Sequence, residues 1–268
     1  MARFRVGVQF HPQHTSVADL RAAWRRADAI GVDSLWVWDH FFPLYPKGGP
    51  YLWPPAGDLT GSHFEAWTLL SAMAADTAKA QLGVLISNIY FRNPDLLADM
   101  ARTVDHVSNG RLILGLGAGN IERDFRAYGF EFASTPERLK ALEAGIGRIK
   151  RRLDQLEPRS AGRLPMLVGG SGTKVTLRLV AQYANMWNSF GPPEDYAKQN
   201  QALDEWCRTL GRDPRAIERT VLLDVPEEAE RLEDFLNAGV QHVIVGCGEP
   251  FDLRPVEDLL RRARLHQS

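Results

Sequence analysis

The chain has 268 residues, of which 44% are hydrophobic and 24% charged, and this supplies apolar material for one large core. The formal net charge of −1 excludes a general electrostatic attraction to nucleic acid or to anionic membranes. Cys207 and Cys247 are the only cysteines. They have no metal-ligand spacing and make no disulfide framework, so we expect buried thiols and no metal site.

The N-terminus and the hydropathy predict a cytoplasmic protein. Met1–Val6 leads directly into a strand pattern, without the apolar run that precedes the cleavage site of a signal peptide. No stretch approaches the roughly 18 continuous apolar residues of a membrane span. These patterns predict a small-molecule partner rather than a membrane.

Short apolar strands alternate with amphipathic helices along the chain. In chain order the patterns predict strands at 4–10, 34–38, 81–89, 112–116, 164–168, 186–190, 217–225 and 242–247. The predicted helices that follow them are 17–30, 64–75, 94–108, 135–156, 172–183, 194–210, 226–238 and 253–265. Pro94 suits the first turn of a helix, Thr135 an N-cap and Gly31 the position after a helix.

Eight strand–helix units predict a parallel sheet that closes into a (β/α)8 barrel, the TIM-barrel fold, as a single domain over residues 1–268. The alternative is an open doubly wound sheet, which would carry a glycine-rich cofactor fingerprint directly after its first strand. Here Gln9–His14 follows that strand without a glycine, which favours the closed barrel. An extended loop rich in proline, glycine and aromatic residues, 39–62, follows the second strand.

In such a barrel the active site lies at the carboxyl ends of the strands. Polar and small residues gather there in this sequence. They are Gln9, His11, Asp39, His40, Ser87, Asn88, Gly117, Gly119, Asn120, Gly169, Gly170, Ser171 and Asn188. His11 and His14 both follow the first strand, and either one could line a substrate pocket.

Several sequence blocks, in order along the chain, resemble the luciferase-like monooxygenase and F420-dependent oxidoreductase superfamily. They are Trp36–His40, Tyr90–Pro94, Thr103–Leu112, Leu114–Gly119, Tyr128–Phe130, Val168–Gly172, Ala184–Asn188 and Ala238–Val240. The most similar subgroup is the actinobacterial type that uses coenzyme F420. The chain departs from that subgroup at Asn120, where a large aromatic residue is usual, and at Phe125, where a histidine is common.

The resemblance implies that Asp39 and His40 lie beside the cofactor ring as catalytic residues, with Asp39 also binding the cofactor. A histidine there can donate a proton to the reduced substrate, and a neighbouring carboxylate can orient it. The alternative is an N-cap aspartate with a structural histidine. The resemblance also places Leu85, Ile86, Ser87 and Asn88 against the cofactor, with a non-proline cis peptide at Leu85–Ile86 or one bond later. The alternative is an ordinary strand end.

Two glycine-rich loops are the remaining candidates for cofactor binding. Gly117, Ala118, Gly119 and Asn120 follow the fourth strand, where glycine lets a backbone approach a ligand closely. Gly169, Gly170, Ser171 and Gly172 lead into a helix, and with Lys174 they suit a phosphate group. The alternative in both places is a tight turn without a ligand. We expect Glu122, Arg123 and Asp124 to face solvent, although one of them could reach the cofactor.

The loop and helix start at 41–67 hold many aromatic residues outside any regular period. Because such side chains are unfavourable in water, we expect them to pack over the active-site mouth, a dimer partner, an apolar substrate or simply the barrel. They are Phe41, Phe42, Tyr45, Tyr51, Trp53, His63, Phe64 and Trp67. By resemblance we expect a homodimer.

The resemblance therefore predicts an F420-dependent oxidoreductase that transfers a hydride between the deazaflavin C5 and a small organic substrate. The first alternative is an FMN-dependent monooxygenase that works with a flavin reductase, because the same fold hosts both chemistries. The second alternative is a non-catalytic protein that binds a flavin or a deazaflavin.

Overall fold

The computed structural model describes residues 4–49, 55, 57–224 and 230–266. Within these residues every pair of neighbouring strands is parallel, in the order β3-β2-β1-β9-β8-β7-β6-β5-β4. The strands are β1 (Arg5–Phe10), β2 (Ser34–Val37), β3 (Gln81–Val84), β4 (Ser87–Asn88), β5 (Leu112–Gly117), β6 (Met166–Gly169), β7 (Met186–Ser189), β8 (Glu218–Leu223) and β9 (His242–Cys247). β3 also pairs with β5, which closes the sheet into a ring.

The strand predicted at 81–89 is divided in two. β3 pairs with the first half of β5 and β4 with its second half, while Leu85 and Ile86 interrupt the pairing. The two short strands therefore fill one position, and the ring has the eight positions of the predicted (β/α)8 barrel. This confirms the fold.

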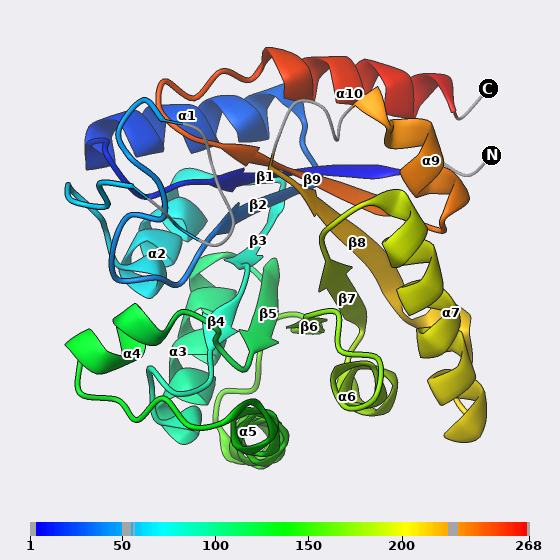
Figure 1. The fold of residues 1–268 in the computed structure, drawn as a ribbon. Coiled ribbons are helices and arrows are strands. Elements are labelled where there is room, and N and C mark those ends of the chain that lie inside the picture. The colour runs from blue at the N-terminus through cyan, green and yellow to red at the C-terminus, as the bar shows by residue number, and fades with distance from the viewer. Residues whose placement is uncertain (1–3, 50–54, 56, 225–229, 267–268) are drawn as a thin grey trace.

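Helices surround the ring and cover its outer face (Figure 1). They are α1 (Val17–Ile30), α2 (Ala66–Asp76), α3 (Pro94–Val107), α4 (Glu122–Ala127), α5 (Thr135–Gln155), α6 (Thr176–Tyr183), α7 (Pro193–Thr209), the 3-10 helix η1 (Pro214–Ala216), α9 (Leu232–Asn237) and α10 (Arg254–Leu265). No helix among the described residues is both long and apolar enough to cross a membrane.

Several helix starts or caps differ from the prediction, among them those of α5, α6 and α9. α6 begins at Thr176 rather than 172, because a turn follows the glycine loop. The N-cap of α5 is Ser134 rather than Thr135, and Glu137 accepts a hydrogen bond from the Ser134 backbone nitrogen (2.9 Å). The helix predicted at 226–238 is described only from 230, since 225–229 lie outside the described residues, and α9 begins at Leu232.

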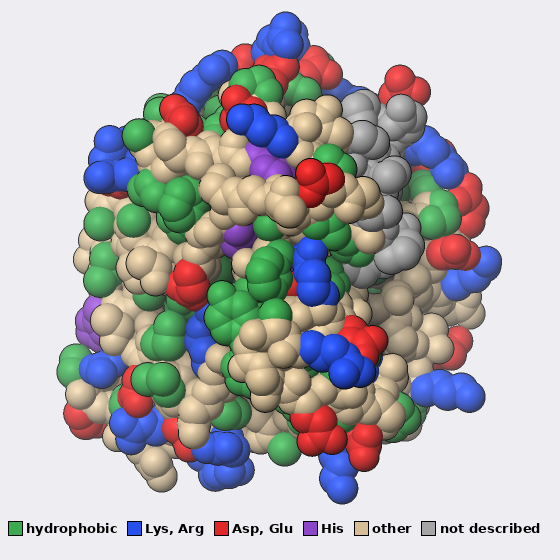
Figure 2. Space-filling view, turned by 60° about the vertical axis from the view of Figure 1, so that its left-hand side comes forward, with side chains coloured by type: hydrophobic (Ala, Val, Ile, Leu, Met, Phe, Trp, Pro, Cys, Tyr) green, Lys and Arg blue, Asp and Glu red, His purple; other side chains and the backbone are tan. Residues whose placement is uncertain are grey.

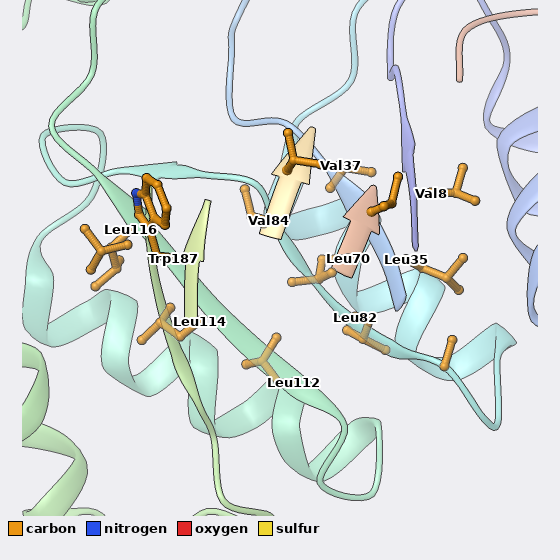
Figure 3. Packing of buried hydrophobic residues seen from close by; sticks show 14 of the residues in the cluster. Val8, Leu35, Val37, Leu70, Leu82, Val84, Leu112, Leu114, Leu116 and Trp187 are labelled. Carbon is orange, nitrogen blue, oxygen red and sulfur yellow. The ribbon is translucent and has the colours of Figure 1, made fainter. Parts of the chain in front are cut away.

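Alternate residues of each strand point to opposite faces and build two apolar layers. The outer layer lies between strands and helices and includes Leu35, Val37, Leu112, Leu114 and Leu116 (Figure 3). The inner layer fills the ring with Trp36, Leu85, Ile113, Leu167, Met186 and Ile244. These side chains fill the interior of the barrel, and a cavity opens at the carboxyl ends of the strands.

Candidate functional site

A cavity of about 620 Å³ opens at the carboxyl ends of the strands, within the usual range for small-molecule sites. Figure 2 looks onto the side of the molecule that carries α2, α4 and the loop after β2, with hydrophobic and histidine side chains near its centre. Most of the predicted site residues line the cavity. They are Asp39, His40, Leu85, Ile86, Asn88, Ala118, Gly119, Asn120, Gly169, Gly170, Ser171 and Gly172.

Three predicted site residues are absent from the wall. Ser87 is turned away, since its hydroxyl accepts a hydrogen bond from Nε1 of Trp67 in α2 (3.0 Å). Gly117 makes room for a neighbour, because a Cβ there would lie 2.1 Å from Cδ1 of Ile86. Lys174 is exposed in the turn before α6.

Ile86 forms the floor of the cavity. The Leu85–Ile86 peptide bond is cis, at the first of the two predicted positions. The Ile86 side chain then occupies the space above the backbone of β5 and β6, where Gly117 and Gly169 leave it room. Nε2 of the buried Gln9 donates to the Leu85 carbonyl (2.8 Å) and holds the interrupted strand in place.

Asp39 lies in a buried ion pair with Arg92, which the sequence reasoning missed as a site residue. Arg92 donates to both carboxylate oxygens (2.7 and 2.9 Å), and the Asn88 backbone nitrogen donates as well (3.1 Å). Arg92 also pairs with Glu65, the N-cap of α2. Burial opposes the charge of Arg92, but Asp39 and Glu65 together raise its pKa above the usual value. Asp39 therefore shares the Arg92 guanidinium with Glu65.

His40 is oriented by Asp124, not by Asp39. Nδ1 of His40 donates to Oδ2 of Asp124 (2.7 Å), a side chain with no exposed surface. The expectation that Asp124 faces solvent was wrong, because α4 packs its residues 124 and 125 inward. This hydrogen bond leaves Nε2 of His40, at the cavity wall, as the nitrogen that can exchange a proton.

Arg138 brings a positive charge to the wall and was also missed. It is 7% exposed, and its guanidinium donates to the Gly119 carbonyl (3.1 Å) and to the Thr135 hydroxyl (3.2 Å). The guanidinium also lies over the ring of Phe132, 4.2 Å from its centre. The helical spacing of Thr135, Arg138 and Leu142 places all three on one face of α5, a signal that the sequence does contain.

The opposite wall is built from the ends of β1, β2 and β8. Trp38 and Asp224 line the cavity, whereas His11 and His14 are not among its lining residues. His11 stacks on Trp38 with ring centres 4.3 Å apart, and its Nδ1 lies 2.7 Å from the Tyr45 hydroxyl. The histidines therefore support the wall from behind.

Aromatic residues of the loop after β2 pack over the rim of the barrel. Phe41 stacks on Tyr128 (3.9 Å between ring centres) and contacts Phe91 (4.3 Å). These contacts support the interpretation that the aromatic side chains in the described part of the loop pack over the barrel. Tyr51 and Trp53 lie outside the described residues.

Comparison with protein families identifies the chain. The model of the luciferase-like monooxygenase family matches residues 1–243. The chain belongs to this family. Since the match covers nearly all the described strands and the cavity residues among them, the family assignment applies to the barrel and its site alike.

Similar curated proteins include a ketoreductase, an F420-dependent dehydrogenase and a monooxygenase. A phthiodiolone/phenolphthiodiolone dimycocerosates ketoreductase of Mycobacterium tuberculosis is 28% identical over 74% of this chain and 58% of its own. An F420-dependent glucose-6-phosphate dehydrogenase of Amycolatopsis mediterranei is 32% identical over 54% of this chain and 40% of its own. A 4-hydroxyprotoasukamycin monooxygenase of Streptomyces nodosus subsp. asukaensis is 29% identical over 80% and 61%. The chain thus spans between 40% and 61% of the lengths of these relatives.

Solved structures share the fold over almost the whole chain. An F420-dependent secondary alcohol dehydrogenase, in complex with an F420-acetone adduct, superposes with a TM-score of 0.81 at 18% identity, covering 97% of this chain and 98% of its own. The F420-dependent tetrahydromethanopterin reductase of Methanopyrus kandleri gives 0.75 at 18% identity, covering 97% of both chains. At such identities the likeness supports the barrel fold alone.

Proposed function

We propose that this protein is an F420-dependent oxidoreductase that transfers a hydride between the deazaflavin C5 and the carbon of a small ketone or alcohol. The observation that carries the proposal is the His40–Asp124 pair at the wall of a cavity whose other parts fit a planar, anionic cofactor. Of the sequence relatives named above, one is an F420-dependent dehydrogenase and one is a ketoreductase.

The cavity residues fit such a cofactor by shape and by charge. Gly119 and Gly170 have φ values of 71° and 130°, so their loops present bare backbone to the cavity. Arg138 stands beside the first loop, and its hydrogen bonds found here all go to uncharged oxygens, which leaves its positive charge for an anionic arm. We assign Gly169–Gly172 and Arg138 to that arm, and Ile86, Asn88 and the Gly119 loop to the ring. Lys174 can act only on the part of the arm that reaches solvent.

The two predicted catalytic residues take different roles in this proposal. When bound, the deazaflavin supplies the ring carbon that gives or accepts the hydride. His40 exchanges a proton with the substrate oxygen through Nε2, while Asp124 holds Nδ1 and stabilises the imidazolium. Asp39, paired with Arg92, accepts a hydrogen bond from the Asn88 backbone nitrogen and is a positioning residue beside the cofactor.

FMN chemistry is the second candidate, supported by the monooxygenase relative that aligns over 80% of the chain. The two candidates are separated by mixing the protein with F420 and with FMN and following fluorescence. Tight binding of F420 alone supports the oxidoreductase, whereas tight binding of FMN with oxygen uptake in the presence of a flavin reductase supports the monooxygenase. Binding of F420 without turnover of any ketone would support a non-catalytic protein. The homodimer, the cytoplasmic location and the single domain over 1–268 stay predictions.

The role of Asp124 is tested by Asp124→Asn. The introduced amide can donate a hydrogen bond to Nδ1 of His40. A neutral His40 then carries its proton on Nε2, so that Nε2 can no longer accept a proton from the alcohol. We expect kcat for alcohol oxidation to fall by about 10²-fold or more, with the cofactor Kd within about twofold of wild type. Unchanged kcat and pH profile would remove the pair from the mechanism.

A further inference from the structure

The proton transfer of the proposed function depends on a very short helix. α4 has six residues, and no side chain caps its N-terminus. Phe125 has no exposed surface and packs against Tyr90 and Phe91. Asp124, beside it, holds Nδ1 of His40. A helix of this length is not stable by itself, so contacts with its neighbours fix its position. The geometry of the His40–Asp124 hydrogen bond therefore depends on what holds α4 in place.

Arg123 links α4 to the loop that follows β2. Its Nη2 donates a hydrogen bond to the Pro43 carbonyl (3.0 Å), and its guanidinium carbon lies over the Phe42 ring, 4.9 Å from the ring centre. The same Nη2 lies 3.5 Å from Oδ1 of Asp124. The Arg123 side chain is 34% exposed and is not among the residues that line the cavity. It therefore lies behind the cavity wall, between the loop and the carboxylate.

One oxygen of the Asp124 carboxylate faces this positive charge. Oδ2 accepts the hydrogen bond from His40, whereas Oδ1 is buried and has no hydrogen-bond partner among the described residues. A buried carboxylate oxygen without a partner lowers the stability of a fold. Nε of Arg123 is buried as well, so salt and water screen the attraction between the two groups less than at the surface. Arg123 is therefore placed to hold the Asp124 carboxylate.

The segment 41–43, which follows His40 directly, is attached to α4 at two places. Phe41 stacks on Tyr128, the residue after the end of the helix (3.9 Å between ring centres). Arg123 binds the same segment near the start of the helix. Of these two attachments, that of Arg123 also reaches the carboxylate. The rigid fork of a guanidinium suits such a junction, because it presents several donors in fixed directions.

We propose that Arg123 is a positioning residue for the proton transfer: it joins residues 42 and 43 to the Asp124 carboxylate and so holds Asp124 against Nδ1 of His40. Arg123 acts through Asp124 and contacts neither the cofactor nor the substrate. The inference rests on the proposed function for the nature of the reaction. The His40–Asp124 hydrogen bond can be observed without any cofactor, so the two claims can fail separately.

The first experiment follows the Nδ1 proton of His40 by NMR in the protein without cofactor. Exchange of this proton with water measures how often the hydrogen bond to Asp124 opens. Arg123→Met removes the guanidinium but keeps an apolar stem, and Arg126→Met is the matched control. Arg126 lies on the same helix, has a side chain that is 75% exposed and pairs with Glu122. His40→Gln assigns the resonance.

We expect the Nδ1 proton to exchange at least about tenfold faster in Arg123→Met than in wild type, and at the wild-type rate in Arg126→Met. Arg123→Lys replaces Arg123→Met if that variant does not fold. It should also exchange faster than wild type, because one ammonium group does not reproduce the fork that serves the Pro43 carbonyl and the carboxylate. Equal exchange in wild type and in the Arg123 variant, or a wild type without a protected Nδ1 proton, would overturn the proposal.

The second experiment measures alcohol oxidation with F420. We expect Arg123→Met to lower kcat at least about tenfold while KM for the alcohol stays within about twofold of wild type. In a chain that already carries Asp124→Asn, the same substitution should change kcat by less than about twofold, because the two residues act as one unit. An equal loss in both backgrounds would show that Arg123 does not act through Asp124 and would overturn the proposal. Failure of wild type to bind F420 would instead refute the proposed function, and the proton exchange would then decide the role of Arg123.

Discussion

Acidification should destabilise this fold through His63. Its Nε2 accepts a hydrogen bond from Nε1 of Trp38 (2.9 Å), and burial, followed by the nearby His40, lowers its pKa from 6.5 to about 4. His63 therefore binds a proton at a higher pH in the unfolded chain than in the folded chain. The stability due to neutral His63 is complete above about pH 6.5 and is lost as the pH falls towards about 4.

The magnitude follows from the two pKa values. Between about pH 7.5 and about pH 5 they give about 2 kcal/mol, which we reduce to about 1–2 kcal/mol because the ring is partly exposed. Urea unfolding at both pH values measures it. His63→Gln keeps an acceptor for Trp38 but cannot titrate, so it should lose about 1–2 kcal/mol less than wild type on acidification. An equal loss in both proteins would refute the reasoning.

Three further predictions concern residues in the cavity wall or packed directly behind it. Arg92→Met leaves the Asp39 carboxylate buried without its partner and should lower the free energy of unfolding in urea by about 3–5 kcal/mol. Adding Asp39→Asn should recover most of this loss, and a double variant no more stable than the single one would contradict the reasoning. Gly117→Ala forces its Cβ against Ile86 and should cost about 1–3 kcal/mol, with Ile86→Val as the rescuing change, and failure of the rescue would show that the strain lies elsewhere. Arg138→Gln should raise the Kd for F420 at least about tenfold and flatten its salt dependence, so an unchanged Kd would place the anionic arm elsewhere.

The sequence predicted the barrel because the same strand–helix pattern recurs along the chain. Periodicity places strands and helices well where an element is long, and α1 and β9 have the predicted limits. It fails where one residue departs from the repeat. The strand predicted at 81–89 has its uninterrupted non-polar run at 82–86, and nothing in that run shows that Ile86 interrupts the pairing.

The candidate-site residues in loops were predicted from the sequence, whereas those on or beside helices were not. Glycine loops and Asp39-His40 stand out at strand ends, and the cavity brings nearly all of them together. Asp124 was expected to face solvent, and Arg92 and Arg138 were overlooked, because charged residues on or beside helices normally face water. α4 has only six residues, too few to show which of its faces is buried.

The position of Ile86 has a consequence for how this scaffold can be altered. Its side chain lines the cavity and rests against the bare backbone of Gly117 and Gly169. We expect a smaller residue at 86 to deepen this part of the cavity and a larger one to make it shallower. Depth and wall chemistry are thus adjusted by separate positions, so ligand size can be redesigned independently of ligand charge.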